Sequence, residues 1–180
     1  QNGGYIRVMV SRGKGAENMR DKAELCAAMD AHGGMVYRLA LCRLGSRSDA
    51  EDVYQDVFLR LFQDETCFTD DAHLRAWLIR VTLNDCRDLR RSAWFQRRAP
   101  LEDWAAAPPV PEGYTDLWNA VASLPEELRT AIYLYYVEGY GTEEIASLTG
   151  CRPTTVRTRL HRARKRLKHQ LEEDRYEVSP

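Results

Sequence analysis

Residues 153–171, PTTVRTRLHRARKRLKHQL, combine a narrow apolar stripe with a strongly basic surface. At 3.6 residues per turn the apolar side chains fall on one side, which predicts an amphipathic helix. They are Val156, Leu160, Ala163, Leu167 and Leu171. The polar side carries Arg157, Thr158, His161, Arg162 and Lys165. Residues 145–171 contain eight Lys or Arg and no Asp or Glu, and this single sign favours nucleic-acid binding over a merely solvated face.

The residues before this helix have the spacing of a helix-turn-helix. Ala146 is small where two helices would cross, Gly150 permits a positive φ in the turn, and Val156 would hold the second helix on the first. The spacing therefore predicts that residues 153–171 form the second helix of the unit. The first turns of such a helix enter the major groove, where side chains reach base edges and phosphates.

The composition of the 180-residue chain is that of a folded protein, with 44% hydrophobic and 29% charged residues. It leaves room for one medium domain or two small ones. Five scattered Cys without a C-x-x-C pair argue against a disulfide framework or a structural zinc site, and we predict no metal or cofactor. No apolar run approaches the roughly 18 residues of a membrane span, so we expect a cytoplasmic protein without membrane insertion.

An acidic helix is predicted at residues 48–62, with Ser48 and Glu51 as a capping box at its start. Its outer face carries Asp52, Gln55, Asp56 and Leu59. A leucine exposed among carboxylates is typical of a contact surface, because its apolar area would otherwise stay in water. The alternative is an acidic solvated face with one stray leucine.

A basic helix is predicted at residues 72–92, after a polar loop whose single aromatic residue is Phe68. Leu74, Trp77, Leu78, Val81 and Leu89 are expected to point inward. The outer line is Arg80, Asn84, Arg87 and Arg91. Arginines can hold a nucleic-acid backbone and an amide can pair with an exposed base edge, so this face suits single-stranded nucleic acid. An arginine-rich solvated helix is the alternative.

The remaining segments define an all-α protein of two helical domains. Residues 1–22 are predicted to be a flexible lead, 23–97 the first domain, 98–115 a Pro-rich linker, 116–172 the second domain and 173–180 a tail. The first domain is expected to open with helices at 23–31 and 35–44, separated by a turn at His32, Gly33 and Gly34. In the second domain we expect Ser123 and Glu126 to cap a helix that ends at Gly139.

This order of elements resembles a bacterial RNA polymerase sigma factor of the extracytoplasmic-function (ECF) group, of the two-domain type. The motifs are YRLALCRLGSRSDAEDVYQDVFLRLF, HLRAWLIRVTLNDCRDLRR and LPEELRTAIYLYYVEGYGTEEIASLTGCRPTTVRTRLHRARKRL. One departure concerns the turn, where the family commonly has Cys-Pro-x-Gly-Thr-Val and this chain has CRPTTV, with its proline one place later.

The resemblance implies a role for each surface in promoter recognition by RNA polymerase. Docking on the β′ clamp helices is implied for Asp52, Gln55, Asp56 and Leu59. Contact with melted minus-ten DNA is implied for Phe68, Arg80, Asn84, Arg87 and Arg91. Reading of minus-thirty-five duplex is implied for Thr154, Thr155, Arg157, Thr158, His161, Arg162 and Lys165. The implied partners are core RNA polymerase, including its β subunit, promoter DNA and an anti-sigma factor.

Two other classes of function are weighed against this one. A stand-alone helix-turn-helix regulator would bind duplex DNA without polymerase and would leave the Asp52 and Asp56 face without a use. A helical nucleic-acid enzyme would need a metal or acid–base site. No matched catalytic constellation or phosphate-binding glycine loop is visible in the sequence, so we expect no catalysis by this chain.

Overall fold

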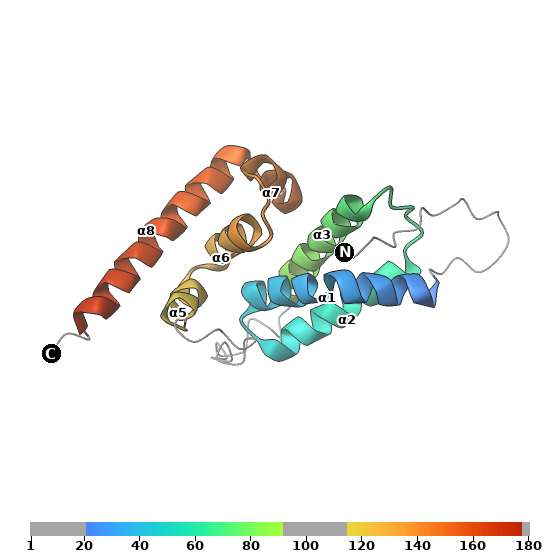
Figure 1. Cartoon of the computed structure of the whole chain (residues 1–180), viewed down its shortest axis with the longest axis horizontal. Helices are drawn as coiled ribbons and strands as arrows, with labels where there is room; N and C mark the ends of the chain where they lie inside the picture. Colours follow the sequence, from blue (N-terminus) through green and yellow to red (C-terminus); the bar gives the residue numbers. More distant parts are fainter. Residues whose placement is uncertain (1–20, 92–114, 178–180) are drawn as a thin grey trace, which may run out of the picture.

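The computed structural model describes residues 21–91 and 115–177, and all the regular elements in these two stretches are helices (Figure 1). The first stretch contains α1 (Lys22–Leu44), α2 (Arg47–Gln63) and α3 (Asp71–Arg91). The second contains α5 (Thr115–Ser123), α6 (Glu126–Ile132), the π-helix η2 (Tyr133–Val137), α7 (Thr142–Thr149) and α8 (Pro153–Glu177). The all-α fold class is therefore confirmed. Most of the predicted lead and linker, and the end of the tail, lie outside the described residues.

The first helix is continuous, so the predicted turn at His32, Gly33 and Gly34 was wrong. Gly33 is used for close approach, because a Cβ there would come to 3.0 Å from the hydroxyl of Tyr54 on α2. His32 is buried inside the helix, and its Nε2 lies 2.7 Å from Oδ1 of Asp71 at the start of α3. Gly33 thus marks a helix crossing, which a sequence pattern cannot distinguish from a turn.

The start of α2 also differs from the prediction, because Ser46 and not Ser48 is its N-cap. The Ser46 hydroxyl accepts a hydrogen bond from the backbone N–H of Asp49 at 3.4 Å, while the Ser48 hydroxyl lies 3.3 Å from that of Ser46. Gly45, in the left-handed region at φ 67°, ends α1 and turns the chain toward this cap. The two serines are equally good caps by residue type, so tertiary placement decides between them.

The buried side of α3 is wider than expected. Leu78 is fully buried as predicted, whereas Leu74, Trp77, Val81 and Leu89 are only half-buried. Ile79, Thr82, Leu83 and Cys86 complete the buried surface. The reason is that α3 contacts α1, α2 and α7, so it is covered on more than one side. Thr82 satisfies its hydroxyl by donating to the backbone carbonyl of Leu78 at 2.7 Å.

The predicted helix of the second domain is formed by α6 and η2, which follow each other without a break, but Ser123 does not cap it. Pro125 is the N-cap of α6 without a side-chain hydrogen bond, and the Ser123 hydroxyl donates instead to the carbonyl of Ala120 at 2.8 Å. The last turn widens into η2 before Gly139, which has a φ of 77°. A π-helical turn moves the following side chains around the helix axis, and such turns are frequent at functional sites.

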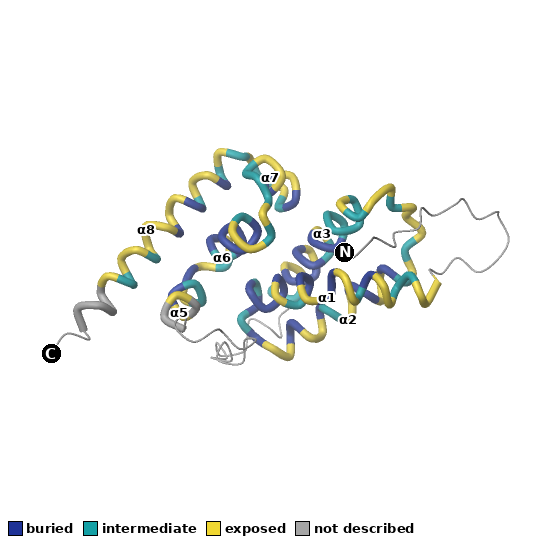
Figure 2. Tube along the Cα trace, viewed as in Figure 1, coloured by how far each residue is buried: buried dark blue, intermediate teal, exposed yellow. Residues whose placement is uncertain are grey.

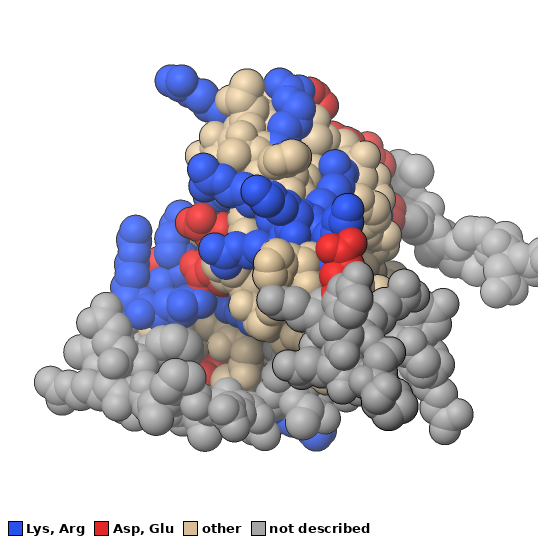
Figure 3. Space-filling view, turned by 90° about the vertical axis from the view of Figure 1, so that its left-hand side faces the viewer, with Lys and Arg blue, Asp and Glu red and all other residues tan. Residues whose placement is uncertain are grey.

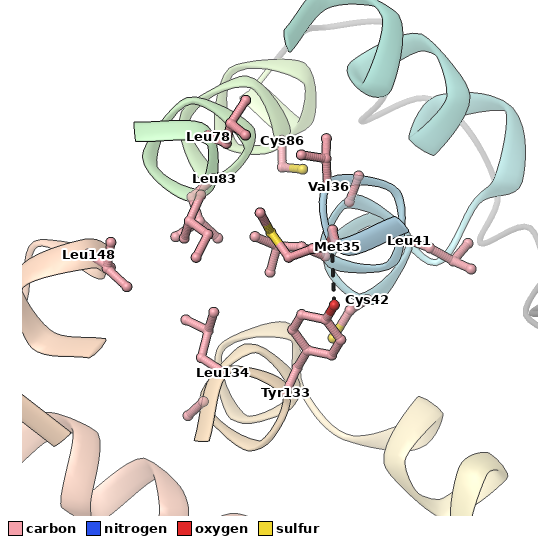
Figure 4. Close-up of a cluster of buried hydrophobic side chains, with 14 of the residues drawn as sticks. Met35, Val36, Leu41, Cys42, Leu78, Leu83, Cys86, Tyr133, Leu134 and Leu148 are labelled. Atoms are coloured by element: carbon pink, nitrogen blue, oxygen red, sulfur yellow. Dashed lines mark hydrogen bonds between the residues drawn. The ribbon is translucent and has the colours of Figure 1, made fainter. Parts of the chain in front are cut away.

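The two helical units are packed against each other. The helix α6 contacts α1, and α7 contacts α3, so one apolar core runs through both units. Figure 4 shows Met35 of α1 facing Tyr133 and Leu134, with Leu83 of α3 between them and Leu148 of α7. The Tyr133 hydroxyl oxygen lies 3.4 Å from the carbonyl oxygen of Met35. The sequence pattern did not predict this contact.

Asp85 supplies a test of stability against pH. Its side chain is 6% exposed, and Oδ1 lies 3.0 Å from Nη2 of Arg60. Burial raises the pKa of Asp85, and Arg60 opposes that rise. Because the pKa is higher in the folded state, the contribution of Asp85 to stability is greatest in acid and is lost as the pH rises through that raised pKa.

We therefore expect Asp85→Asn to remove this loss. Between about pH 4 and about pH 7, the free energy of unfolding of the variant should exceed that of the unmodified chain by on the order of 1 kcal/mol or less. Arg60 is largely solvated, so the loss of its ion pair with Asp85 costs little. Urea denaturation at several pH values measures the difference. If Asp85→Asn is instead less stable than the unmodified chain at about pH 7, the ion pair with Arg60 outweighs the cost of burying the carboxylate.

Candidate functional site

The helix-turn-helix predicted from Ala146, Gly150 and Val156 is formed by α7 and α8. Gly141 is the N-cap of α7, and its N–H donates to Oε2 of Glu144 at 2.7 Å. Gly150 has a φ of 66° and ends the helix. Ala146 and Val156 are both buried, as the crossing of the two helices requires. Pro153 opens α8, where its missing N–H costs nothing, so the shifted proline is compatible with the motif.

The second helix of this unit presents its basic side to solvent. Val156, Leu160 and Ala163 are buried against the rest of the unit, and Figure 2 shows exposed residues along the other side of α8. Arg157, Thr158, His161, Arg162, Lys165 and Thr154 are exposed, and Thr155 is half-buried. Seen from the side on which α8 lies, Figure 3 shows Lys and Arg spread over the surface, with smaller patches of Asp and Glu between them.

The arginines of α8 divide into two groups. Arg159 lies 3.3 Å from Glu127, and Arg164 donates to the Tyr136 hydroxyl at 2.8 Å, so these two hold α8 on α6 and η2. Arg157 is exposed and lies 3.3 Å from Glu143 of α7. The Thr142 hydroxyl, followed by weaker contacts that include Arg157, lowers the pKa of Glu143. Counting basic residues alone did not separate the packing arginines from the outward ones.

The outer line of α3 is exposed as predicted and faces a hollow. Arg87 donates from Nη2 to Oδ1 of Asn84 at 2.9 Å, which orients the amide. Arg80, Asn84 and Arg87 line a cavity of about 370 Å³ together with residues of α7 and the start of α8. Arg43 and Arg159 also line it, although the sequence pattern places neither on a nucleic-acid surface.

Two further residues assigned to this surface lie apart from that cavity. Phe68 packs edge-on against His73 and Trp77, with ring centroids 5.3 and 5.7 Å apart. Arg91 is exposed at the end of α3 and does not line the cavity. The structure thus brings Arg80, Asn84 and Arg87 together and leaves Phe68 and Arg91 at either end of the helix.

The acidic surface of α2 is exposed as its periodicity predicts. Asp52, Gln55 and Asp56 reach solvent, and the side chain of Leu59 is 53% exposed. Arg60 is directed to Asp85 instead, so it does not neutralise this face directly. A leucine left this open beside two carboxylates supports a contact surface.

The described residues include no cluster of His, Cys, Asp and Glu suited to a metal ion, and none of the helices there is long and apolar enough to cross a membrane. The thiols differ in environment. Cys26 and Cys67 are exposed, whereas burial raises the pKa of Cys42 and of Cys86 to about 12 in each case. The buried thiols are therefore poor nucleophiles at neutral pH.

Comparison with known proteins assigns both units. The family model described as Sigma-70 region 2 matches residues 28–96, and the model described as Sigma-70, region 4 matches residues 114–167. The ECF RNA polymerase sigma factor SigM of Mycobacterium tuberculosis is 32% identical over 86% of this chain and 87% of its own length. The chain belongs to the ECF RNA polymerase sigma factors.

Other relatives of this sigma factor agree. SigL of Mycobacterium tuberculosis is 33% identical, over 85% of this chain and 92% of its own length. SigE of Mycolicibacterium smegmatis is 36% identical over 78% of this chain, which spans only 58% of that relative.

Two solved structures resemble the whole arrangement. RpoE of Bartonella quintana, in complex with the anti-sigma factor NepR, has a TM-score of 0.64 at 25% identity and covers 84% of this chain and 96% of its own. CnrH, in complex with the cytosolic domain of CnrY, has a TM-score of 0.62 at 27% identity, with coverages of 86% and 91%. Each likeness therefore spans both helical units.

Proposed function

We propose that this sigma factor binds core RNA polymerase and directs it to specific promoters, by reading minus-thirty-five duplex and melted minus-ten DNA. The observation that carries the proposal is the exposed face of residues 153–171 of α8, which carry basic and no acidic side chains, on a well-formed helix-turn-helix, in a chain that also carries a second arginine-rich face on α3. This chain supplies promoter recognition, whereas the polymerase catalyses RNA synthesis. Both act in the cytoplasm.

The minus-thirty-five duplex is assigned to the start of α8. Arg157, Thr158, His161 and Arg162 project from consecutive turns, which matches the length of helix that a major groove admits. Thr154, Thr155 and Lys165 flank them and suit phosphate contacts. Arg159 is excluded from this role because Glu127 holds it on the inner side of the helix.

Melted minus-ten DNA is assigned to α3. The hydrogen bond from Arg87 occupies the amide oxygen of Asn84 and leaves the amide nitrogen as a donor for an unstacked base. Arg80 and Arg91 lie along the same face for the backbone, and Phe68 with Trp77 offers aromatic surface at the start of the helix. Contacts to an unstacked base exist only after melting, so binding there favours the open state.

Core polymerase is assigned to the acidic face of α2, through Asp52, Gln55, Asp56 and Leu59, with the β′ clamp helices as the partner and a further contact to the β subunit. The solved relatives are held by NepR and by CnrY, and we propose that this sigma factor too has an anti-sigma partner.

Transcription in vitro from a pool of promoter fragments tests the proposal. Purified core polymerase is mixed with the full chain, and the transcripts are sequenced. We expect specific starts that require the chain, and the pool then reports the promoter sequence. A stand-alone regulator, the rival function, would retain tight specific duplex binding without polymerase and would produce no new starts.

A further inference from the structure

The cavity beside α3 and α7 is lined by several arginines and little negative charge. Among the described residues that line it, the charged ones are Arg43, Arg80, Arg87, Arg159 and Glu127. The cavity volume is about 370 Å³, which lies within the range of small-ligand pockets. A hollow of this size with four guanidinium groups and one carboxylate in its lining is suited to an anion.

The four arginines lie at two depths. The side chains of Arg43 and Arg159 are only 14% and 24% exposed, so they belong to the inner part of the cavity. The side chain of Arg87 is 52% exposed, and Arg80 is also exposed, so these two lie at its mouth. A small anion inside the cavity can contact both pairs, whereas a DNA strand that runs over the surface of α3 reaches only the outer pair.

The inner positive charge is incompletely compensated. Arg43 donates from Nη1 to the Thr130 hydroxyl at 3.3 Å, and its Nη2 lies 3.7 Å from Glu126. That carboxylate has Arg90 as a closer partner. Among the residues that the structure describes, Nε of Arg43 is buried and has no hydrogen-bond partner. Burial lowers the pKa of Arg43, and the charge of Arg159 acts in the same direction. An anion placed between such neighbouring cations would stabilise both.

Two neutral groups in the lining can donate to the same anion. The amide oxygen of Asn84 accepts from Arg87 at 2.9 Å, so its amide nitrogen is left as a donor. Ser147 of α7 is exposed and lines the cavity, so its hydroxyl is a second donor. Phosphate oxygens accept from guanidinium forks and from neutral donors alike, and the planar fork of arginine matches phosphate geometry. Phosphate is therefore the anionic group that this lining fits.

Part of the lining is apolar, which favours an organic phosphate over a free inorganic ion. The apolar residues are Leu83, Ala131, Ile145, Leu148 and Val156. Figure 4 shows Leu83 on α3 and Leu148 on α7, the helices at the two sides of the hollow. An inorganic ion would leave this apolar surface uncovered, whereas an organic ring would cover it. Apolar side chains do not distinguish one ring from another by hydrogen bonds, so the organic part is recognised by its shape.

We propose that this cavity binds a small organic phosphate of the class of a nucleoside diphosphate. Its phosphates contact the arginines at both depths, and its organic part lies against Leu83 and Leu148. This binding does not depend on the proposed function. A consequence that does rest on the proposed function follows from Arg80, Asn84 and Arg87, which are also assigned to minus-ten DNA. The ligand and the DNA strand compete for these side chains.

Titration calorimetry of the full-length chain with ADP, at fixed ionic strength, tests the binding. ADP supplies a diphosphate and a ring, adenosine supplies the ring alone, and inorganic pyrophosphate supplies the diphosphate alone. We expect one ADP per chain, no binding of adenosine, and pyrophosphate bound about tenfold more weakly than ADP because the apolar contact is missing. Absence of ADP binding would overturn the site. Pyrophosphate bound as tightly as ADP would overturn the role of the apolar lining.

Ser147→Glu locates the ligand in this cavity. The glutamate carboxylate can pair with the arginines and occupy the place of a phosphate, so ADP should bind at least about tenfold more weakly than to Ser147→Gln, which has the same size and no charge. Ser147 is exposed, so neither substitution disturbs a buried contact. Arg47→Gln on α2 makes the same change of net charge outside the cavity and should leave ADP binding unaltered. Equal ADP affinities of the two Ser147 variants would exclude this cavity as the site.

Competition is measured by fluorescence anisotropy with a random pool of single-stranded DNA oligonucleotides, at constant ionic strength. With ADP at about ten times its dissociation constant, the unmodified chain should bind the pool about tenfold more weakly. Unchanged DNA affinity in saturating ADP would overturn the shared use of α3. If ADP binds as expected while promoter-dependent transcription fails, the ligand site stands and the proposed function does not. Transcription by a chain that does not bind ADP would retain the function and reject the ligand site.

Discussion

Asp52→Lys combined with Asp56→Lys should abolish the binding of this sigma factor to core RNA polymerase while leaving its helix content unchanged. Both side chains are exposed on one face of α2, so charge reversal there disturbs no buried contact. If the partner surface is basic, two reversed charges place like charges opposite each other at a cost of several kcal/mol, which is at least about 100-fold in affinity. Co-purification with core polymerase and circular dichroism of the free variant measure the two effects.

Asp30→Lys is a suitable control for this experiment. Asp30 is exposed on α1, outside the acidic face, and its reversal alters the net charge in the same direction. We expect it to bind polymerase nearly as the unmodified chain does. Full polymerase binding by the Asp52 and Asp56 double variant would remove α2 as the docking helix, whatever its effect on transcription.

Arg162→Ala should weaken binding to the selected promoter by about 1–3 kcal/mol if Arg162 reads a base edge. Arg162 is exposed on α8, one turn after Thr158, and is not used to hold α8 on α6. A guanidinium paired with a guanine edge makes two directed hydrogen bonds, and alanine leaves those base atoms without partners. Affinities for the duplex are compared by anisotropy at fixed salt, on the selected sequence and on scrambled DNA.

Lys168→Ala provides the comparison on the same helix, because Lys168 is exposed and lies 3.7 Å from Glu172, beyond the proposed reading turns. It should weaken both DNAs slightly and equally. An equal loss on selected and scrambled DNA for Arg162→Ala would make Arg162 a phosphate contact instead of a specificity residue.

The local sequence pattern was sufficient to predict several features of this molecule. The apolar stripe of Val156, Leu160 and Ala163 correctly marked the buried side of α8, and Gly150 correctly marked a left-handed helix end. The local pattern gave wrong predictions where the same residues suit two local structures equally well. Ser46 and Ser48 are both acceptable caps, and Gly33 with Gly34 suits either a turn or a close helix crossing. Only the position of Tyr54 on α2 decides the second case.

The sequence by itself determined the helix-turn-helix and the outward faces of α2, α3 and α8, because these depend on periodicity within one helix. Only the tertiary structure decided how the two units meet. That contact joins Glu126 to Arg90 and Glu138 to Arg75, residues far apart in the chain whose charges look like ordinary solvated ones in sequence. Partial burial makes each of these charges depend on its partner, and burial is a property of the packed units rather than of any single helix.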